Sequence, residues 1–89
     1  MSITKTLKVI SDPVRRNILE LLKDGQMSIA EKFDLTNAAV SYHLSQLKQA
    51  GLILENKQKN FIYYELNLSV FEDIRGWIQS LGGNENEKA

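Results

Sequence analysis

The stretch "IAEKFDLTNAAVSYHLSQLKQ" (residues 29–49) constrains the fold of this chain more than any other part. Ala30 is small enough to let two helices approach closely, and Leu35 is an apolar residue suited to the turn between them. The second half carries an apolar stripe at helical spacing, made of Val40, Leu44 and Leu47. Two helices that pack around a tight turn form a helix-turn-helix, so the stretch predicts this motif.

Capping residues give the expected bounds of the two helices in this motif. Ser28 is a cap candidate for the first, "IAEKF", which is barely longer than one turn. Thr36 or Asn37 caps the second helix, which we expect to run to about residues 50–51.

The segment before the motif predicts two amphipathic helices. The first covers residues 2–10, and its apolar residues at helical spacing are Ile3, Leu7 and Ile10. The second begins at Asp12, which can cap it, and Pro13, which suits the first helical position. Its apolar stripe consists of Val14, Ile18, Leu21 and Leu22. Gly25 stands where a left-handed helix stop is expected.

The period of the apolar residues changes after Gly51. The segments "LILENK" and "FIYYEL" are rich in β-branched and aromatic residues and are separated by the polar "QKN", which predicts a β-hairpin. Asn67 or Ser69 begins a last helix. One side of that helix is apolar and consists of Val70, Phe71, Ile74, Trp77, Ile78 and Leu81.

The predicted fold class is therefore mainly α with a small β-hairpin (α+β), in the arrangement of a winged helix-turn-helix. Its order is helix, helix, short helix, long helix, strand, strand, helix. We expect residues 1–81 to form one domain for DNA binding and dimerisation, and residues 82–89 to form a flexible polar tail.

The residue inventory excludes several kinds of site. The chain has no cysteine, which rules out disulfides, thiolate metal sites and cysteine nucleophiles. His43 is the only histidine, whereas zinc needs three or four ligands. Ser41 and Ser45 lie two positions to either side of His43, and residues at that offset do not face each other on a helix. With no acid–base pair and no phosphate loop, we expect no enzyme activity, no cofactor, no metal and no small-molecule substrate.

Hydropathy and charge leave nucleic acid open as a partner. No apolar run approaches the roughly 20 residues of a membrane helix, and "MSITKTLKVI" lacks a signal core, so we expect a cytoplasmic protein.

The formal net charge is zero, which argues mildly against DNA binding. The charges are segregated, however: residues 1–23 carry +3 and residues 36–60 carry +2.

The long helix of the motif predicts a surface that can enter the major groove. At about 100° per residue, one arc lies opposite the apolar stripe and contains Ala38, Ser41, Tyr42 and Ser45. These side chains are small or form hydrogen bonds, and none is a carboxylate. Asn37 lies near the helix start, where recognition helices meet base edges. His43 falls on the flank of the stripe, which favours a structural role or a phosphate contact.

Three separated segments, "SDPVRRNILELL", "SYHLSQLKQAGLI" and "FIYYEL", resemble the ArsR family of bacterial winged-helix repressors. The spacing and the hairpin look like the branch that contains the sporulation-delaying-protein autorepressor. The resemblance implies a homodimer that represses transcription, often of its own gene, from a near-palindromic DNA operator. It also suggests a membrane protein that sequesters the repressor as a further partner.

The resemblance also implies site residues. The positions that contact bases and phosphates fall on Thr36, Asn37, Ala38, Ser41, Tyr42 and Ser45, with Lys57 and Lys59 at the tip of the hairpin. Arg15 or Arg16 is a further candidate for a phosphate or dimer contact. The first and last helices would form the dimer interface through Ile3, Leu7, Phe71, Ile74, Trp77, Ile78 and Leu81.

The chain departs from the family pattern at three points. The helix that "IAEKF" begins is about one turn short, and the cysteine box that metal-sensing members carry near it is missing. Lys59 stands where the hairpin turn commonly has glycine, so a different or looser turn is expected there. Asp and His metal ligands on the last helix are missing too, which makes a metal-responsive sensor an unfavoured alternative. The main alternative is a winged-helix protein-interaction module with weak or no DNA binding.

Overall fold

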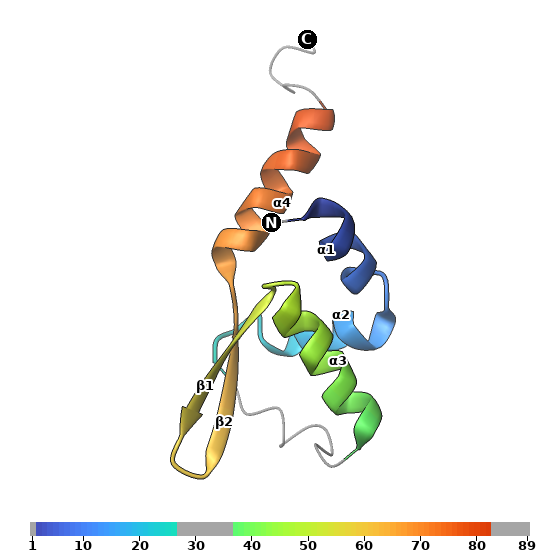
Figure 1. Ribbon diagram of the computed structural model, residues 1–89. Coiled ribbons are helices and arrows are strands. Elements are labelled where there is room, and N and C mark those ends of the chain that lie inside the picture. The colour runs from blue at the N-terminus through green and yellow to red at the C-terminus, as the bar shows by residue number, and fades with distance from the viewer. Residues whose placement is uncertain (1, 27–36, 83–89) are drawn as a thin grey trace.

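The computed structural model describes residues 2–26 and 37–82 of the chain. Its elements follow the predicted order (Figure 1): α1 (Ile3–Ile10), α2 (Pro13–Leu21), α3 (Ala38–Gln49), β1 (Ile53–Gln58), β2 (Phe61–Leu66) and α4 (Leu68–Leu81). The predicted class, helices with one small antiparallel hairpin in winged helix-turn-helix order, is confirmed. The predicted short helix after Ser28 lies outside the described residues, as do residues 83–89 of the predicted tail.

Capping side chains start the first two helices, and the cap of the second is the predicted one. Ser2 Oγ accepts the backbone N–H of Lys5 at 3.2 Å. Asp12 Oδ1 accepts those of Val14 at 2.8 Å and Arg15 at 3.2 Å, and Pro13 opens α2. Burial acts to raise the pKa of Asp12, but these hydrogen bonds and the nearby cations outweigh it and lower that pKa below its usual value.

One hydrophobic core joins all six elements or their adjoining turns. Its buried members are Val9, Ile18, Leu22, Leu44, Leu47, Leu52, Ile53, Tyr64 and Ile74. The predicted stripe of α3 is confirmed, because Leu44 and Leu47 are buried and Val40 packs against them. Burying apolar area at about 25 cal/mol per Å² makes this cluster the main source of stability.

The apolar stripes predicted for α1 and α2 are only partly buried. In α1 the buried residues are Thr6 and Val9, while Leu7 is 39% exposed. In α2 the exposed fraction of Val14 is 38%. Each helix has only two to three turns, so it buries a narrower arc than the full set of its apolar residues covers.

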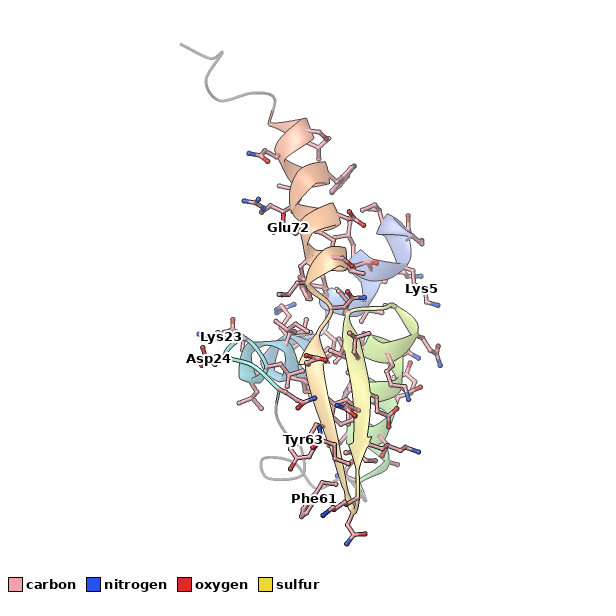
Figure 2. The ribbon with its side chains drawn as sticks, turned by 90° about the vertical axis from the view of Figure 1, so that its left-hand side faces the viewer. Lys5, Lys23, Asp24, Phe61, Tyr63 and Glu72 are labelled. Atoms are coloured by element: carbon pink, nitrogen blue, oxygen red, sulfur yellow. The ribbon has the colours of Figure 1, made fainter. Side chains whose placement is uncertain are left out.

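Strands β1 and β2 form an antiparallel hairpin, called the wing below, with Ile53 opposite Leu66 and Gln58 opposite Phe61. Alternation along the strands gives the wing two faces. The inner face, toward α3, carries Ile53, Glu55 and Lys57 with Ile62, Tyr64 and Leu66. On the outer face the rings of Phe61 and Tyr63 lie 6.3 Å apart, and both point to the same side in Figure 2.

The turn after α3 connects this helix to the wing and to α4. Gly51 has φ of +77°, a left-handed conformation that ends the helix as predicted. Asn67, at the N-cap position of α4, donates from its side-chain nitrogen to Gly51 O and from its backbone to Leu52 O, both at 2.9 Å. The outer part of α4 then extends away from the rest of the protein (Figure 1).

Candidate nucleic-acid interface

Asn37 caps α3, which confirms one of the two predicted cap candidates. Its Oδ1 accepts the backbone N–H of Ala39 at 2.8 Å and that of Val40 at 3.4 Å. The side-chain oxygen of Asn37 therefore holds the helix start. A base contact from Asn37 would have to use its amide nitrogen. Thr36, the other predicted contact at this end, lies outside the described residues.

The side of α3 that faces away from the core carries the residues predicted from the helical period. Ala38, Ser41 and Tyr42 are exposed, with Tyr42 at 57%. Ser45 is half-buried and accepts a hydrogen bond from Gln49 Nε2 at 3.1 Å. Since α3 contains no acidic residue, no carboxylate of this helix would repel a DNA phosphate. The twelve-residue helix is about 18 Å long, which suits the length of contact a major groove allows.

The wing places two cations beside this helix. Lys57 and Lys59 are both exposed, and Lys59 is the first of the two residues in the turn between β1 and β2. Lys59 has φ of +56°, the only positive φ of a non-glycine residue in residues 2–26 and 37–82. The turn is therefore a tight two-residue turn and not a looser one. A side chain in this region costs about 1–2 kcal/mol compared with a right-handed conformation.

His43 lies at the edge of α3, half-buried as its predicted flank position requires. Its Nδ1 is 3.1 Å from Nη1 of Arg15. Its ring meets that of Tyr42 edge-on, with centroids 5.7 Å apart. Of the two roles expected for His43, these contacts support the structural one.

Arg15 and Arg16, the two candidate phosphate contacts on α2, hold the end of α1. Arg15 Nε donates to Val9 O at 2.7 Å. Arg16 NH1 donates to the carbonyls of Ile10 and Ser11, both at 2.9 Å. These bonds satisfy carbonyls that the end of a helix leaves without partners.

A groove of about 240 Å³ separates α3 from the inner face of the wing. It is lined by Ser41, Leu44, Ser45, Lys48, Ile62 and Tyr64. At its rim Lys48 Nζ and Glu55 Oε1 lie 2.5 Å apart, which joins α3 to β1. The hydrogen bond to Glu55 raises the pKa of Lys48, and burial followed by the charge of Glu55 raises that of Tyr64. The sequence prediction missed this pair, because no short-range pattern connects the end of a helix to the middle of the next strand.

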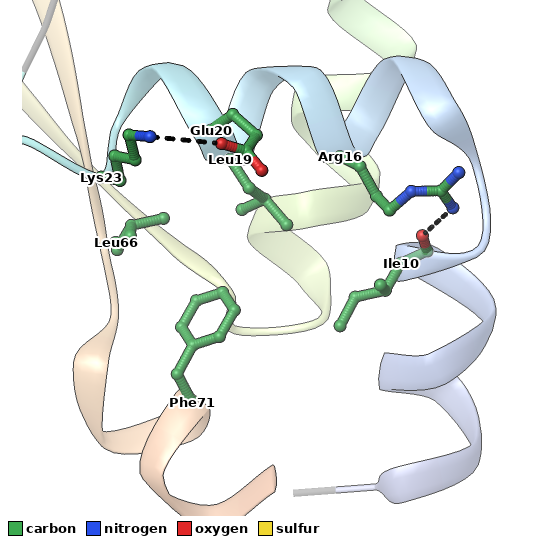
Figure 3. A pocket seen from close by; sticks show the side chains of 7 residues that line it. All are labelled: Ile10, Arg16, Leu19, Glu20, Lys23, Leu66 and Phe71. Carbon is green, nitrogen blue, oxygen red and sulfur yellow. Dashed lines mark hydrogen bonds and ion pairs between the residues drawn. The ribbon is translucent and has the colours of Figure 1, made fainter. Parts of the chain in front are cut away.

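A second, larger groove of about 300 Å³ lies between α2, α4 and the end of β2 (Figure 3). Its apolar floor consists of Ile10, Leu19, Leu66 and Phe71. The charges at its rim have partners, since Lys23 Nζ lies 3.6 Å from Glu20 Oε1 and Arg16 donates to Ile10 O. The paired charges give no sign of an ionic ligand.

The predicted dimer residues divide between core and surface. Ile74 is buried in the core and Phe71 packs against it, so both serve the fold of their own chain. Farther along α4 the side chains emerge: Trp77 is 38%, Ile78 54% and Leu81 68% exposed. On α1, Leu7 is exposed and Ile3 half-buried. Leu68, at the start of α4, is also an exposed apolar residue, 67% exposed. The sequence analysis did not identify it because it precedes the periodic stripe.

Residues 2–26 and 37–82 contain no group of three or more histidine, cysteine or acidic side chains arranged to hold a metal ion. They also contain no helix with the length and apolarity needed to cross a membrane.

Comparison with known sequences gives consistent matches. The family model "Bacterial regulatory protein, arsR family" matches residues 12–54. The chain is 47% identical over 74 residues to the transcriptional repressor SdpR of Bacillus subtilis, covering 80% of this chain and 82% of that protein. It is 33% identical over 78 residues to the arsenical resistance operon repressor of Staphylococcus aureus, covering 84% and 72% respectively.

Solved structures match the fold over almost the whole chain. An ArsR family transcriptional regulator superposes with a TM-score of 0.79 at 20% identity, covering 98% of this chain and 93% of that one. A homodimeric winged helix-turn-helix DNA-binding domain from Mycobacterium bovis superposes with a TM-score of 0.68 at 22% identity, covering 98% and 83%. At these identities the superpositions concern the fold alone.

Proposed function

Because the chain belongs to the arsR family of bacterial regulatory proteins, we propose that it is a sequence-specific DNA-binding repressor that acts as a homodimer. The chain is a transcription regulator and not an enzyme. The proposed target is a near-palindromic operator, and the proposed regulated gene is its own. A DNA partner of this kind implies a cytoplasmic protein.

The exposed face of α3 is the observation that carries the proposal. Ala38, Ser41 and Tyr42 project from a helix without acidic residues, and the core holds the opposite side through Leu44 and Leu47. A rigid helix with small and hydrogen-bonding side chains is suited to reading base edges in a major groove. The Tyr42 hydroxyl and the Ser41 hydroxyl are the proposed base-reading groups.

The wing supplies the proposed phosphate contacts. A hairpin beside a helix in the major groove must cross one sugar-phosphate backbone to reach the next groove. Lys57 and Lys59 are exposed on the part of the wing that would make this crossing. Each lysine that neutralises one phosphate makes the plot of log binding constant against log salt concentration steeper by about 0.9, whatever the DNA sequence.

The proposed dimer rests on the apolar surface of α4 and α1. Trp77, Ile78 and Leu81 lie on the part of α4 that extends away from the core, and Leu7 is exposed on α1. Covering this surface with the same surface of a second copy would form a two-fold interface. Two-fold symmetry would place the two α3 helices about one DNA turn apart, roughly 34–36 Å.

Binding to the DNA upstream of its own gene tests the proposal. We expect a specific complex that survives competition by unrelated DNA, with a footprint on two half-sites about one helical turn apart. Light scattering of the free protein should give the mass of a dimer. A reporter gene under the same promoter should be less active when the protein is present, which tests autorepression directly.

A protein-interaction module is the second candidate, and the zero net charge favours it. A module of this kind would give no salt-sensitive specific complex at micromolar protein.

The membrane protein that the family resemblance suggests is a further proposed partner of the repressor. Binding to membranes of the source cells that lowers the amount of operator complex would support it.

A further inference from the structure

The ion pair between Lys48 and Glu55 differs from the other ion pairs among the described residues. Lys23–Glu20 and Arg75–Glu72 each join residues three positions apart and are largely exposed. Lys48 Nζ and Glu55 Oε1, 2.5 Å apart, instead connect the last turn of α3 to the middle of β1. The Glu55 side chain is 22% exposed and that of Lys48 is 46% exposed, so the pair is partly shielded from water.

The position of Glu55 on the wing gives this pair its importance. Glu55 lies directly opposite Tyr64, which is 6% exposed and lines the groove against α3. On β2 the half-buried Ile62, opposite Lys57, also packs against the core. On β1 every residue beyond Glu55 is exposed, so Glu55 is the last half-buried residue of that strand before the tip. Lys59 lies four residues farther on, about 13 Å along the strand. A two-stranded hairpin is marginally stable by itself, so its direction depends on such contacts.

We propose that Lys48 and Glu55 are positioning residues that hold the wing at a fixed angle to α3 and thereby place Lys57 and Lys59 on the DNA backbone. This inference rests on the proposed DNA-binding function. Glu55 acts through Lys48 and has no contact with DNA in this arrangement. Its carboxylate supports DNA binding although it carries the same sign of charge as the phosphates.

The direction in which Glu55→Gln changes DNA affinity distinguishes a positioning role from a simple effect of charge. Glu55→Gln removes a negative charge, which by itself should strengthen binding to any DNA. If the ion pair holds the wing, the same change should weaken binding to the operator, by roughly 2- to 5-fold, which is the value of a partly exposed ion pair. Glu65→Gln is the matched control, because Glu65 lies opposite Leu54 on the other face of the wing. It changes the net charge equally and should leave operator affinity unchanged or slightly higher.

A second comparison tests whether the wing tip is what Glu55 controls. Lys59→Ala should weaken binding in the natural protein and should weaken it less in the Glu55→Gln background, because the tip is then no longer held in place. Lys48→Arg should retain affinity, since arginine can keep the pair, whereas Lys48→Met should lose it. Fluorescence anisotropy with labelled operator measures all of these affinities, and circular dichroism checks that each variant is folded.

The outcomes are distinguishable. If Glu55→Gln strengthens binding as much as Glu65→Gln does, the pair has no positioning role and the inference is wrong. A full effect of Lys59→Ala in the Glu55→Gln background would also overturn it, because the tip would then be placed without the pair. If the unaltered protein forms no specific complex with any tested promoter DNA, the proposed function itself fails and the inference fails with it.

Discussion

The guanidinium of Arg15 and the imidazole of His43 meet at 3.1 Å, across 28 positions of the sequence. Arginine has donors only, so Nδ1 of His43 must accept this hydrogen bond. A ring that accepts at Nδ1 carries its proton on Nε2. Because Arg15 also donates to Val9 O, the contact connects α3 to the end of α1.

The tautomer of His43 can be measured directly. Since the chain has one histidine, a nitrogen–proton correlation spectrum of the imidazole at pH 7.5 needs no assignment. We expect the pattern of a ring that carries its proton on Nε2 and accepts at Nδ1. A ring protonated on Nδ1 would contradict the contact. In an Arg15→Met variant this preference should weaken, whereas Arg16→Met, which removes bonds to Ile10 and Ser11 only, should leave it unchanged.

Ser41 and Tyr42 should contribute more to operator affinity than to stability. Both are exposed, and the ring of Tyr42 meets that of His43 edge-on, so Ser41→Ala and Tyr42→Ala should each change the free energy of unfolding by no more than about 1 kcal/mol. Each should reduce operator binding by roughly 1–3 kcal/mol and leave binding to unrelated DNA nearly unchanged. Titrations with operator and scrambled duplexes measure the difference. Unchanged operator affinity in both variants would mean that this face of α3 does not read bases, and Ser80→Ala on α4 serves as a control.

Replacing Lys59 should change stability and DNA binding in opposite directions. Glycine adopts a φ of +56° without the steric cost of lysine, so Lys59→Gly should stabilise the protein by up to about 1 kcal/mol in urea denaturation. Loss of the cation should weaken binding to all DNA sequences alike and reduce the salt slope by about 1. Lys57→Ala is the control, because it removes a charge from a strand position and should leave stability unchanged. Lower stability of Lys59→Gly would show that lysine is not strained in this turn.

A charge on the exposed part of α4 should separate the proposed dimer. Ile78 is 54% exposed, so Ile78→Glu should leave the fold of one chain intact while placing a carboxylate in the interface. We expect a monomer in sedimentation analysis and a large loss of operator affinity, with binding to a single half-site affected less. Gln79→Glu on the same helix is the matched control and should remain dimeric. A dimeric Ile78→Glu protein would exclude this face as the interface.

Helix starts and the order of elements could be predicted because their causes are local. Asp12, Asn37 and Gly51 act within three or four residues of their own positions, so short sequence patterns reveal them. The contacts Arg15–His43 and Lys48–Glu55 could not be predicted in this way. They join different elements, and no periodicity connects their members.

The dimer residues show a second limit of sequence patterns. Ile74 and Ile78 belong to the same apolar stripe of α4, yet one is 7% exposed and the other 54%. The helical period indicates which side of a helix is apolar. It does not indicate where along the helix the supporting core ends, because that depends on the packing of α1, α2 and the wing. One stripe therefore contains both a core residue and residues that the single chain leaves exposed.

The two bonds from Asn67 to Gly51 and Leu52 close the base of the wing. Ile53 and Tyr64 at the base of the wing belong to the core, whereas residues 56–61 at its tip are all exposed. Insertions, deletions or a different turn at the tip therefore leave α3 and α4 where they are. In the proposed repressor, evolution can therefore change how far the tip of the wing reaches along DNA while α3 and the α4 surface keep their spacing.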